Sequence, residues 1–204
     1  MLRMLYRRIL LAVLLIFTTA LYAHAADAPT QKDEVMEQEE APPGGDFTLQ
    51  SADGPVSTRD LRGRVIMLYF GYTKCPDVCP TSLSFMTQAL NELSDEELEK
   101  ITSIFVSVDP KRDTVEALAE YVDYFHENFV GVTGSEEEIA HVAKLYGAKY
   151  YDVELEGSAF GYSVNHSAAT YLIDQQGELR FLFPHQTPPS VILEAIRYLF
   201  AEKQ

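Results

Sequence analysis

Two cysteines, Cys75 and Cys79, are the only cysteines in the 204-residue sequence, and three residues separate them. Thiols at this spacing can form a local disulfide, exchange disulfides with another protein, or bind a metal ion as thiolates. A disulfide that closes so short a loop restricts the unfolded chain little, and a chain of this size can bury a sufficient core without cross-links. Reversible thiol chemistry or metal binding therefore explains the pair better than a structural disulfide does.

The spacing of the cysteines bears on this choice. Redox enzymes of the thioredoxin type usually carry Cys-x-x-Cys, whereas Pro76, Asp77 and Val78 intervene here. The longer spacing lets two sulfurs converge on a third atom, and two soft thiolates favour a soft ion such as Cu(I), while structural zinc normally requires four protein ligands. Since the chain has no further cysteine, a metal site has to be completed by histidine or methionine.

The residues around the cysteines predict a connection between a strand and a helix. The uninterrupted apolar run at residues 65–70 is typical of a strand that is buried on both faces. After Pro80, which suits a first helical turn, apolar residues recur at intervals of three and four. If Cys79 lies at the start of this helix, the unpaired N–H groups and the positive end of the helix dipole there should favour its thiolate. The same helical spacing assigns Met86 to the core.

The remaining patterns predict an α/β fold. A hairpin is expected to turn at Asp53-Gly54. Strands are expected at residues 104–108, 130–132, 168–173 and 179–183. Helices are expected to begin at a capping box at residues 113–116, at Ser135 with Glu138, and at Pro188-Pro189. A βαβ segment followed by a ββα unit is the plan of a thioredoxin-like fold, with a central mixed sheet flanked by helices and an N-terminal β-hairpin extension.

The N-terminal sequence predicts export. Arg3, Arg7 and Arg8 precede an apolar stretch that ends on small residues near position 25, which is the pattern of a signal peptide. The stretch from residue 9 to residue 23 is shorter than the roughly 20 residues that a spanning helix needs. We therefore expect residues 1–25 to be a signal peptide and the protein to be periplasmic, with an N-terminal anchor in the inner membrane as the alternative.

The next segment is acidic. Residues 26–45 carry six acids against one lysine and end in Pro-Pro-Gly-Gly, which predicts an acidic disordered linker, and residues 46–204 then form a single domain. The formal net charge of the chain is −15, and loss of the three arginines of residues 1–25, which include no acid, takes it to −18. Such a charge repels nucleic acid and favours basic partners. In an oxidising compartment the thiols would also require a reductant, such as a thioredoxin-like protein.

Among the five histidines, His166 is the one expected near the cysteines. It precedes the predicted strand at residues 168–173, which in a thioredoxin-like topology starts at the end of the sheet where the cysteine loop lies. A hydrogen-bonded structural role is the alternative for His166. The others that follow residue 25 (His126, His141 and His185) are interpreted as surface or structural histidines. Asp109-Pro110 could line the same end of the sheet or could be an ordinary turn.

Three segments of the sequence, YFGYTKCPDVCPTSL, SVDPKRDT and VNHSAATYLID, resemble the SCO/SenC family of copper-binding thioredoxin-like proteins from about residue 46 to residue 200. The resemblance implies that Cys75, Cys79 and His166 hold copper and help to metallate the dinuclear copper centre of cytochrome c oxidase. It also implies a redox role, because copper is accepted only by the reduced pair. One departure is Asn165, which stands where the family commonly has aspartate before the histidine.

The sequence therefore predicts an exported copper chaperone that binds Cu(I) through Cys75, Cys79 and His166 and delivers it to the copper-receiving subunit of cytochrome c oxidase. The alternative is a thiol-disulfide oxidoreductase in which the same cysteine pair reduces an oxidase subunit or another exported protein. A peroxiredoxin-like peroxidase is disfavoured, because Tyr72 and Pro76 stand where that family carries proline and threonine. A binding module with an inert disulfide is the remaining alternative.

Overall fold

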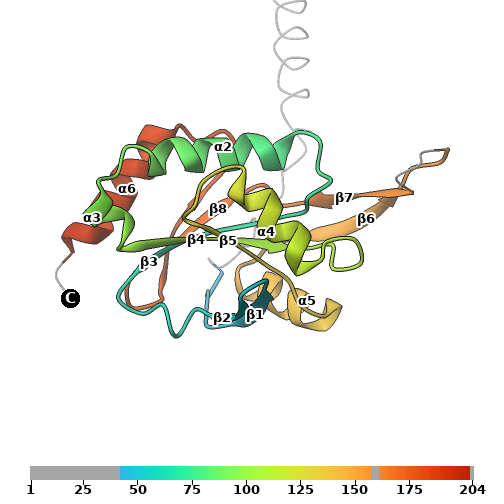
Figure 1. Cartoon of the computed structure of the whole chain (residues 1–204), viewed down its shortest axis with the longest axis horizontal. Helices are drawn as coiled ribbons and strands as arrows, with labels where there is room; N and C mark the ends of the chain where they lie inside the picture. The colour runs from blue at the N-terminus through green and yellow to red at the C-terminus, as the bar shows by residue number, and fades with distance from the viewer. Residues whose placement is uncertain (1–41, 158–160, 203–204) are drawn as a thin grey trace, which may run out of the picture. The chain divides into compact units, whose positions relative to one another are not determined.

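The computed structural model describes residues 42–157 and 161–202 (Figure 1). The predicted signal peptide at residues 1–25 and residues 26–41 of the predicted linker lie outside this range. Within it, no helix is both long enough and apolar enough to cross a membrane. Residues 42–45, the end of the predicted linker, pack on the domain: the N–H of Gly44 donates to the Leu145 carbonyl at 2.9 Å, and the Tyr146 hydroxyl donates to the Gly45 carbonyl at 2.8 Å.

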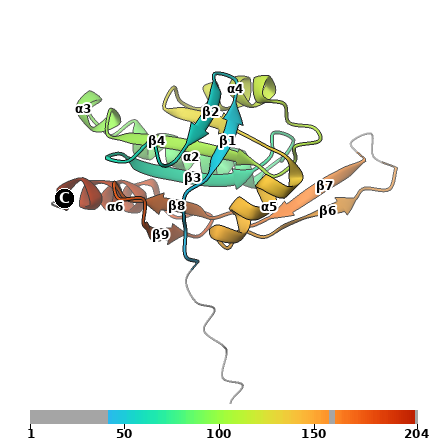
Figure 2. The ribbon, with the colours of Figure 1, turned by 90° about the horizontal axis from the view of Figure 1, so that it is seen from below.

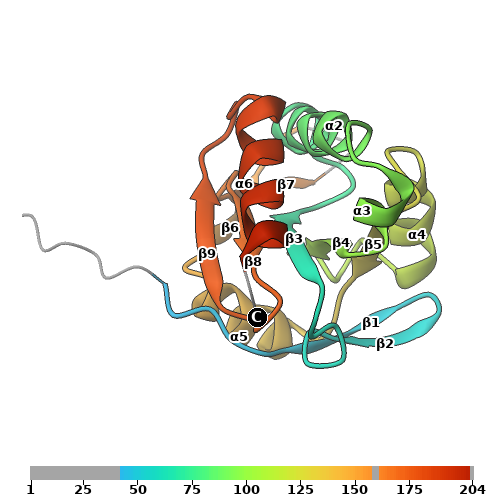
Figure 3. The same ribbon diagram turned by 90° about the vertical axis from the view of Figure 1, so that its left-hand side faces the viewer.

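A five-stranded mixed sheet forms the centre of the domain, in the order β5-β4-β3-β8-β9 (Figure 3). Strands β3, β4 and β5 are parallel, β8 is antiparallel to β3, and β9 is antiparallel to β8. Every residue of β3 and β4 is buried, which explains the uninterrupted apolar sequence of β3 and the apolar residues at the centre of β4. The strands are β3 (Val65–Gly71), β4 (Ile101–Ser107), β5 (Phe129–Val132), β8 (Thr170–Ile173) and β9 (Leu179–Phe183).

Helices and a hairpin cover the two faces of this sheet (Figures 1 and 2). Helices α2 (Val78–Leu90) and α6 (Pro189–Ala201) pack together on one face. Helix α5 (Glu136–Leu145) and the hairpin of β1 (Thr48–Ser51) and β2 (Gly54–Ser57) lie on the other. The predicted α/β thioredoxin-like architecture with an N-terminal hairpin is therefore confirmed. Two further helices complete the domain: α3 (Asp95–Leu98), and α4 (Val115–Asp123), which packs along β5.

A second hairpin was not predicted from the sequence. Strands β6 (Tyr150–Glu154) and β7 (Tyr162–His166) pair with each other as a separate antiparallel sheet, which projects beyond the central sheet (Figure 1). Most residues of both strands are partly or fully exposed, so their sequences lack the buried apolar run that revealed β3 and β4. His166 thus ends an exposed hairpin strand just before β8 begins.

The predicted helix starts were confirmed for α5 and corrected for α4. Ser135 and Glu138 form a reciprocal capping box at α5. At α4 the cap is Thr114, whose side chain accepts from the Ala117 N–H, whereas the predicted capping box began at Asp113. Asp113 is buried and bonds elsewhere, to Thr73 and Ser107. A long-range contact of this kind has no signature in the local sequence.

Candidate metal centre

The segment that carries the cysteines is fixed at both ends by the core. It leaves β3 at Gly71, whose carbonyl accepts from the Val108 N–H at 2.8 Å. At Thr73 both the N–H and the hydroxyl donate to the buried Asp113 carboxylate, at 2.9 and 2.6 Å. Cys75 follows in the loop, and Cys79 is the second residue of α2. The expected connection from strand to helix is therefore confirmed.

Gly71 allows a close approach of the Cys79 sulfur to the end of β3. A Cβ atom at position 71 would lie 2.7 Å from Cys79 Sγ and 2.9 Å from Phe105 Cε2, which is closer than real Cβ contacts come. Both neighbours are buried in the core and cannot move away freely. Glycine is therefore required at position 71 for steric reasons.

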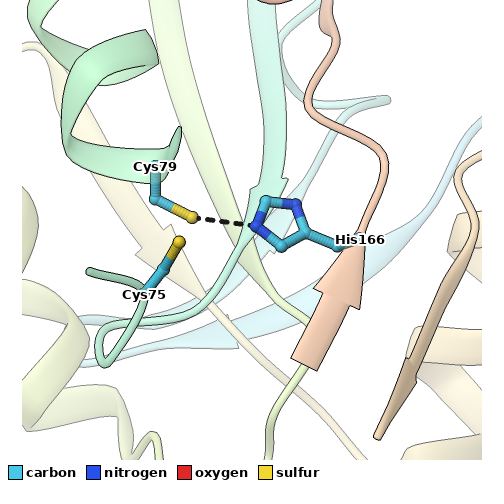
Figure 4. A group of neighbouring side chains, drawn as sticks. All are labelled: Cys75, Cys79 and His166. Carbon is cyan, nitrogen blue, oxygen red and sulfur yellow. Dashed lines mark hydrogen bonds between the residues drawn. The ribbon is translucent and has the colours of Figure 1, made fainter. Parts of the chain in front are cut away.

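His166 approaches the cysteines from the end of β7 (Figure 4). Its Nδ1 lies 3.1 Å from the Ser167 carbonyl oxygen, and its Nε2 lies 3.2 Å from Cys79 Sγ. Because a carbonyl can only accept a hydrogen bond, this contact places a proton on Nδ1, and Nε2 is the ring nitrogen that faces the two cysteines. A histidine oriented in this way is ready to ligate a metal through Nε2.

The structure brings Cys75, Cys79 and His166 together: their ligand atoms all lie within 4.8 Å of one another. Cys75 is 9 % exposed, Cys79 is 0 % exposed, and His166 is partly exposed. Both cysteines are free thiols. The rings of Tyr69 and Tyr72 meet the His166 ring nearly at right angles, with centroids 6.2 and 5.8 Å away. The cluster therefore has aromatic neighbours and one accessible side.

The two cysteines differ in their acidity. Hydrogen bonds from the Cys79 and His166 side chains, together with the backbone N–H groups of Asp77 and Cys79, lower the pKa of Cys75 to about 3. Burial and the adjacent Cys75 raise the pKa of Cys79 well above its usual value. The expectation that the helix start would make Cys79 the thiolate was wrong, because its complete burial outweighs the helix dipole. The thiolate of the pair is Cys75.

The donor set suits a soft cation. Two sulfurs and one imidazole nitrogen make a three-ligand group of the type that favours Cu(I), and it lacks the fourth protein ligand of a structural zinc site. Among the described residues this is the one group of three or more histidine, cysteine and acidic side chains close enough to share an ion. Met86 lies in the core, as predicted, and is fully buried there.

The other described histidines lie apart from this group. His185 Nδ1 is 2.9 Å from the Ser82 hydroxyl, and His126 Nδ1 accepts from the Asn128 N–H at 3.0 Å. His126 follows α4, which ends at Asp123. His141 is exposed on α5.

The side chain of Asn165, the residue at which the sequence departs from the family pattern, lies away from the candidate site. Its Nδ2 donates to the Tyr151 hydroxyl at 2.8 Å, across the hairpin from the directly opposite position. Successive side chains of a strand point to opposite faces, so Asn165 and His166 face different ways. The orientation of His166 comes from Ser167 instead.

Sequence reasoning missed several residues that hold the site together. Asp109 was considered as a possible lining residue, and it is buried next to β7, where it accepts from the Tyr162 hydroxyl. Arg112 contacts both Asp109 and Tyr162. The available signal was the segment SVDPKRDT, which contains Asp109 and Arg112, but no local pattern connects it with β7.

Comparison with known proteins assigns the family. The family model described as SCO1/SenC matches residues 35–201, so the chain belongs to the SCO1/SenC family. One relative is the SCO2-like protein RC0895 of Rickettsia conorii, which is 39 % identical over 155 residues that cover 76 % of this chain and 75 % of the relative. The resemblance inferred from the three sequence segments is therefore confirmed.

Solved structures agree with this assignment. Arabidopsis thaliana ScoI with copper bound superposes with a TM-score of 0.68 at 34 % identity, covering 77 % of this chain and 97 % of that chain. BsSco, described as having a disulfide switch and as a member of the Sco family of cytochrome c oxidase assembly proteins, superposes with a TM-score of 0.63 at 25 % identity, covering 80 % and 96 %. These relatives connect the fold with copper and with oxidase assembly.

Proposed function

We propose that this protein is an exported copper chaperone, which binds Cu(I) through Cys75, Cys79 and His166 and delivers it to the dinuclear copper centre of cytochrome c oxidase. The observation that carries the proposal is the convergence of two sulfurs and one imidazole nitrogen within 4.8 Å of one another. The copper bound to the Arabidopsis relative and the oxidase-assembly role stated for the family of BsSco support the same function.

The differences between the three donors suggest an order of binding. Cys75 is already a thiolate and is the more exposed cysteine, so it is the first sulfur that an incoming Cu(I) ion meets. Cys79 must lose its proton to become the second ligand. His166 contributes the lone pair of Nε2, while the contact of Nδ1 with the Ser167 carbonyl keeps the ring oriented.

The same geometry supports the proposed transfer to a partner. Cys75 and His166 are the donors with solvent exposure, whereas Cys79 is closed off by the core. A receiving subunit could therefore replace the exposed ligands one at a time without unfolding the domain. We propose the periplasm as the location and a thioredoxin-like protein as the reductant that keeps the pair in the thiol form.

The test is Cu(I) binding by the reduced full-length protein, measured by competition with a chelator of known affinity. The His166→Ala variant should bind Cu(I) more than about 100-fold more weakly, because loss of a ligand should exceed the effect of losing an outer-shell partner. His141→Ala, which removes an exposed histidine of α5, is the matched control and should bind as the wild type does. Unchanged stoichiometry and affinity in His166→Ala would contradict the three-ligand site.

A second candidate function is thiol-disulfide exchange, which is favoured by the low pKa of Cys75 and by its greater exposure, 9 % against 0 % for Cys79. In this function the Cys75 thiolate attacks a partner disulfide, and Cys79 then attacks the mixed disulfide, which releases the reduced partner and leaves Cys75 and Cys79 oxidised to a disulfide. His166→Ala separates the two functions, because disulfide exchange should survive a change that abolishes tight copper binding.

A further inference from the structure

We propose that Arg112 and Asp109 are positioning residues that hold His166 within reach of the two cysteines, so that the site offers three ligands instead of two. The inference rests on the proposed copper-binding function and adds to it two residues that do not themselves contact the ion. Three features of the structure support this role: the contacts of Arg112 with the hairpin, its contact with Tyr72 next to the cysteines, and the absence of ladder pairing between the hairpin and the central sheet.

The first contacts tie the start of β7 to the loop after β4. Arg112 Nη1 donates to the Tyr162 carbonyl at 2.8 Å, and its guanidinium carbon lies 3.7 Å from the centroid of the Tyr162 ring. The Tyr162 hydroxyl donates to Asp109 Oδ1 at 2.6 Å, and Arg112 Nε donates to the other carboxylate oxygen. Backbone, ring and hydroxyl of one tyrosine are thus all held by one ion pair.

The second contact reaches the cysteine side. The guanidinium carbon of Arg112 lies 5.7 Å from the centroid of the Tyr72 ring, and that ring meets the His166 ring edge-on. The Tyr72 carbonyl also accepts from the N–H of Cys75 at 3.3 Å. One guanidinium therefore contacts a residue of each of the two segments that carry the ligands.

The third feature is the way in which the β6–β7 hairpin is attached to the domain. Strands β6 and β7 form their own two-stranded sheet, so the ladder of the central sheet does not fix the direction of β7. Tyr162, Val164 and His166 alternate along β7 and share the face that points to the domain. Tyr162 stands four residues before His166, about 13 Å away along the strand. Holding Tyr162 in place therefore sets the direction in which β7 carries His166.

The choice between three ligands and two matters most for Cu(II). Two thiolates alone suffice for the soft Cu(I) ion, whereas Cu(II) prefers nitrogen ligands and a tetragonal arrangement. We call the contacts of Arg112 and Asp109 with Tyr162 the clamp. If loss of the clamp lets His166 move away from the cysteines, affinity for Cu(II) should fall more than affinity for Cu(I). A merely structural role for Arg112 would lower both affinities together.

The experiment compares full-length wild type with Arg112→Met, Arg112→Lys and Arg197→Met. Methionine removes the guanidinium N–H donors and the positive charge, whereas lysine keeps a positive charge opposite Asp109 without the planar group that stacks on Tyr162. Arg197, which pairs with Glu97 between α6 and α3, is a control of the same type outside the cluster. The first measurement is the affinity for Cu(II) and for Cu(I). The second is the nitrogen hyperfine pattern of bound Cu(II) in electron paramagnetic resonance. The third is the nuclear Overhauser contact between the His166 ring and Cys79 in the reduced metal-free protein.

We expect Arg112→Met to lower Cu(II) affinity about 10- to 100-fold, the range for loss of an outer-shell partner, with a smaller loss for Cu(I). The nitrogen hyperfine pattern and the contact between His166 and Cys79 should weaken, Arg112→Lys should restore part of each, and Arg197→Met should match the wild type. If Arg112→Met does not fold, Tyr162→Phe, which removes only the hydroxyl bonded to Asp109, should give the same changes at smaller size.

Wild-type nitrogen hyperfine and affinities in Arg112→Met, or in Tyr162→Phe where that variant replaces it, would overturn the proposal. So would equal losses for both ions that follow the thermal midpoint, because these indicate a structural role alone. Failure of the copper-binding function is recognised separately: the wild type would then bind no copper tightly, or His166→Ala would have no effect. The contact between His166 and Cys79 in the metal-free protein tests the clamp even in that case.

Discussion

The cysteine segment and the β6–β7 hairpin meet at one site but are held in different ways. Cys75 lies in the loop between the fully buried strand β3 and helix α2, Cys79 lies in the first turn of α2, and Asp113 fixes the start of the loop at Thr73. His166 lies at the end of a partly exposed hairpin that forms its own sheet. Main-chain ladders and core packing hold the first region, whereas a few side-chain contacts hold the second.

This difference teaches how such a site can bind tightly and still release its ion. Two ligands come from a segment that packs on the buried core, and the third comes from a hairpin outside the central sheet, which should move at lower cost. Changes to the cysteine segment should therefore act on stability and binding together. Changes to the hairpin should act on the ligand set with less effect on stability.

The largest expected effect concerns the cysteine segment and is the pH dependence of alkylation at Cys75. Because the Cys79 side chain holds the pKa of Cys75 at about 3, Cys75 is a thiolate at any pH well above 3, and its rate of alkylation by iodoacetamide should stay flat from pH 5 to pH 8. The rate for an ordinary thiol rises about tenfold per pH unit over this range, or about 1000-fold in total. The rate at Cys75 should fall only as the pH approaches 3. Mass spectrometry identifies the modified cysteine.

The control for this prediction is a pair of variants at Cys79. Cys79→Ser keeps a hydroxyl that can donate to Cys75, so the flat profile should persist. Cys79→Ala removes the donor and should move the rise in rate to higher pH. A wild-type rate that rises tenfold per pH unit between pH 5 and pH 8 would show that Cys75 is an ordinary thiol.

The next largest effect is expected when the hydrogen bonds that anchor the cysteine loop to Asp113 are removed. Asp113→Ala removes the acceptor of three hydrogen bonds, two from Thr73 and one from Ser107, and leaves the buried Ser107 hydroxyl and the partly buried Thr73 donors without this partner. We expect the free energy of unfolding, measured by urea denaturation, to fall by about 3 kcal/mol. Asp123→Ala, at an exposed aspartate of α4, should change it by less than about 0.5 kcal/mol. Equal effects of the two changes would remove Asp113 as an anchor.

Gly71→Ala tests the packing between β3 and the Cys79 sulfur. The added methyl group would lie 2.7 Å from Cys79 Sγ and 2.9 Å from Phe105, and overpacking of this kind costs about 1–3 kcal/mol. The sulfur should be displaced, so that Cu(I) affinity falls together with the urea midpoint. An unchanged midpoint with unchanged affinity would mean that the core has room for the methyl group.

The smallest effect belongs to the hairpin. Asn165→Asp restores the residue that the family commonly carries, and its carboxylate can accept from the Tyr151 hydroxyl that now accepts from Asn165. Since the side chain is exposed and faces away from His166, Cu(I) affinity should change by less than about fivefold, equivalent to less than about 1 kcal/mol. A larger gain in competition titrations would show that the carboxylate acts on the site through space.

The sequence predicted the central part of the fold well and the peripheral part poorly. Strands β3 and β9, the α5 capping box and the hairpin at Asp53-Gly54 were recognisable because burial or a local turn dictates their residues. Hairpin β6–β7 was missed, since Val164 is its one fully buried strand residue and no run of buried apolar residues marks its strands. The short helix α3 was missed as well, because four residues carry too little periodicity.

The candidate site shows the same division. The types and spacing of Cys75 and Cys79 pointed to thiolate chemistry, and the family resemblance added His166. Neither could show which cysteine is the thiolate. That depends on the folded surroundings: hydrogen bonds lower the pKa of Cys75, and complete burial raises the pKa of Cys79.

The sequence by itself determined the family, the thioredoxin-like core and the three residues that we propose as ligands, because local patterns and short motifs record these directly. The tertiary structure alone decided how the ligands meet: the 3.2 Å approach of His166 to Cys79 and the contacts of Arg112 with Tyr72 and Tyr162. These contacts join segments that are far apart in the chain. Their energies depend on folded distances and burial, which no stretch of sequence encodes locally.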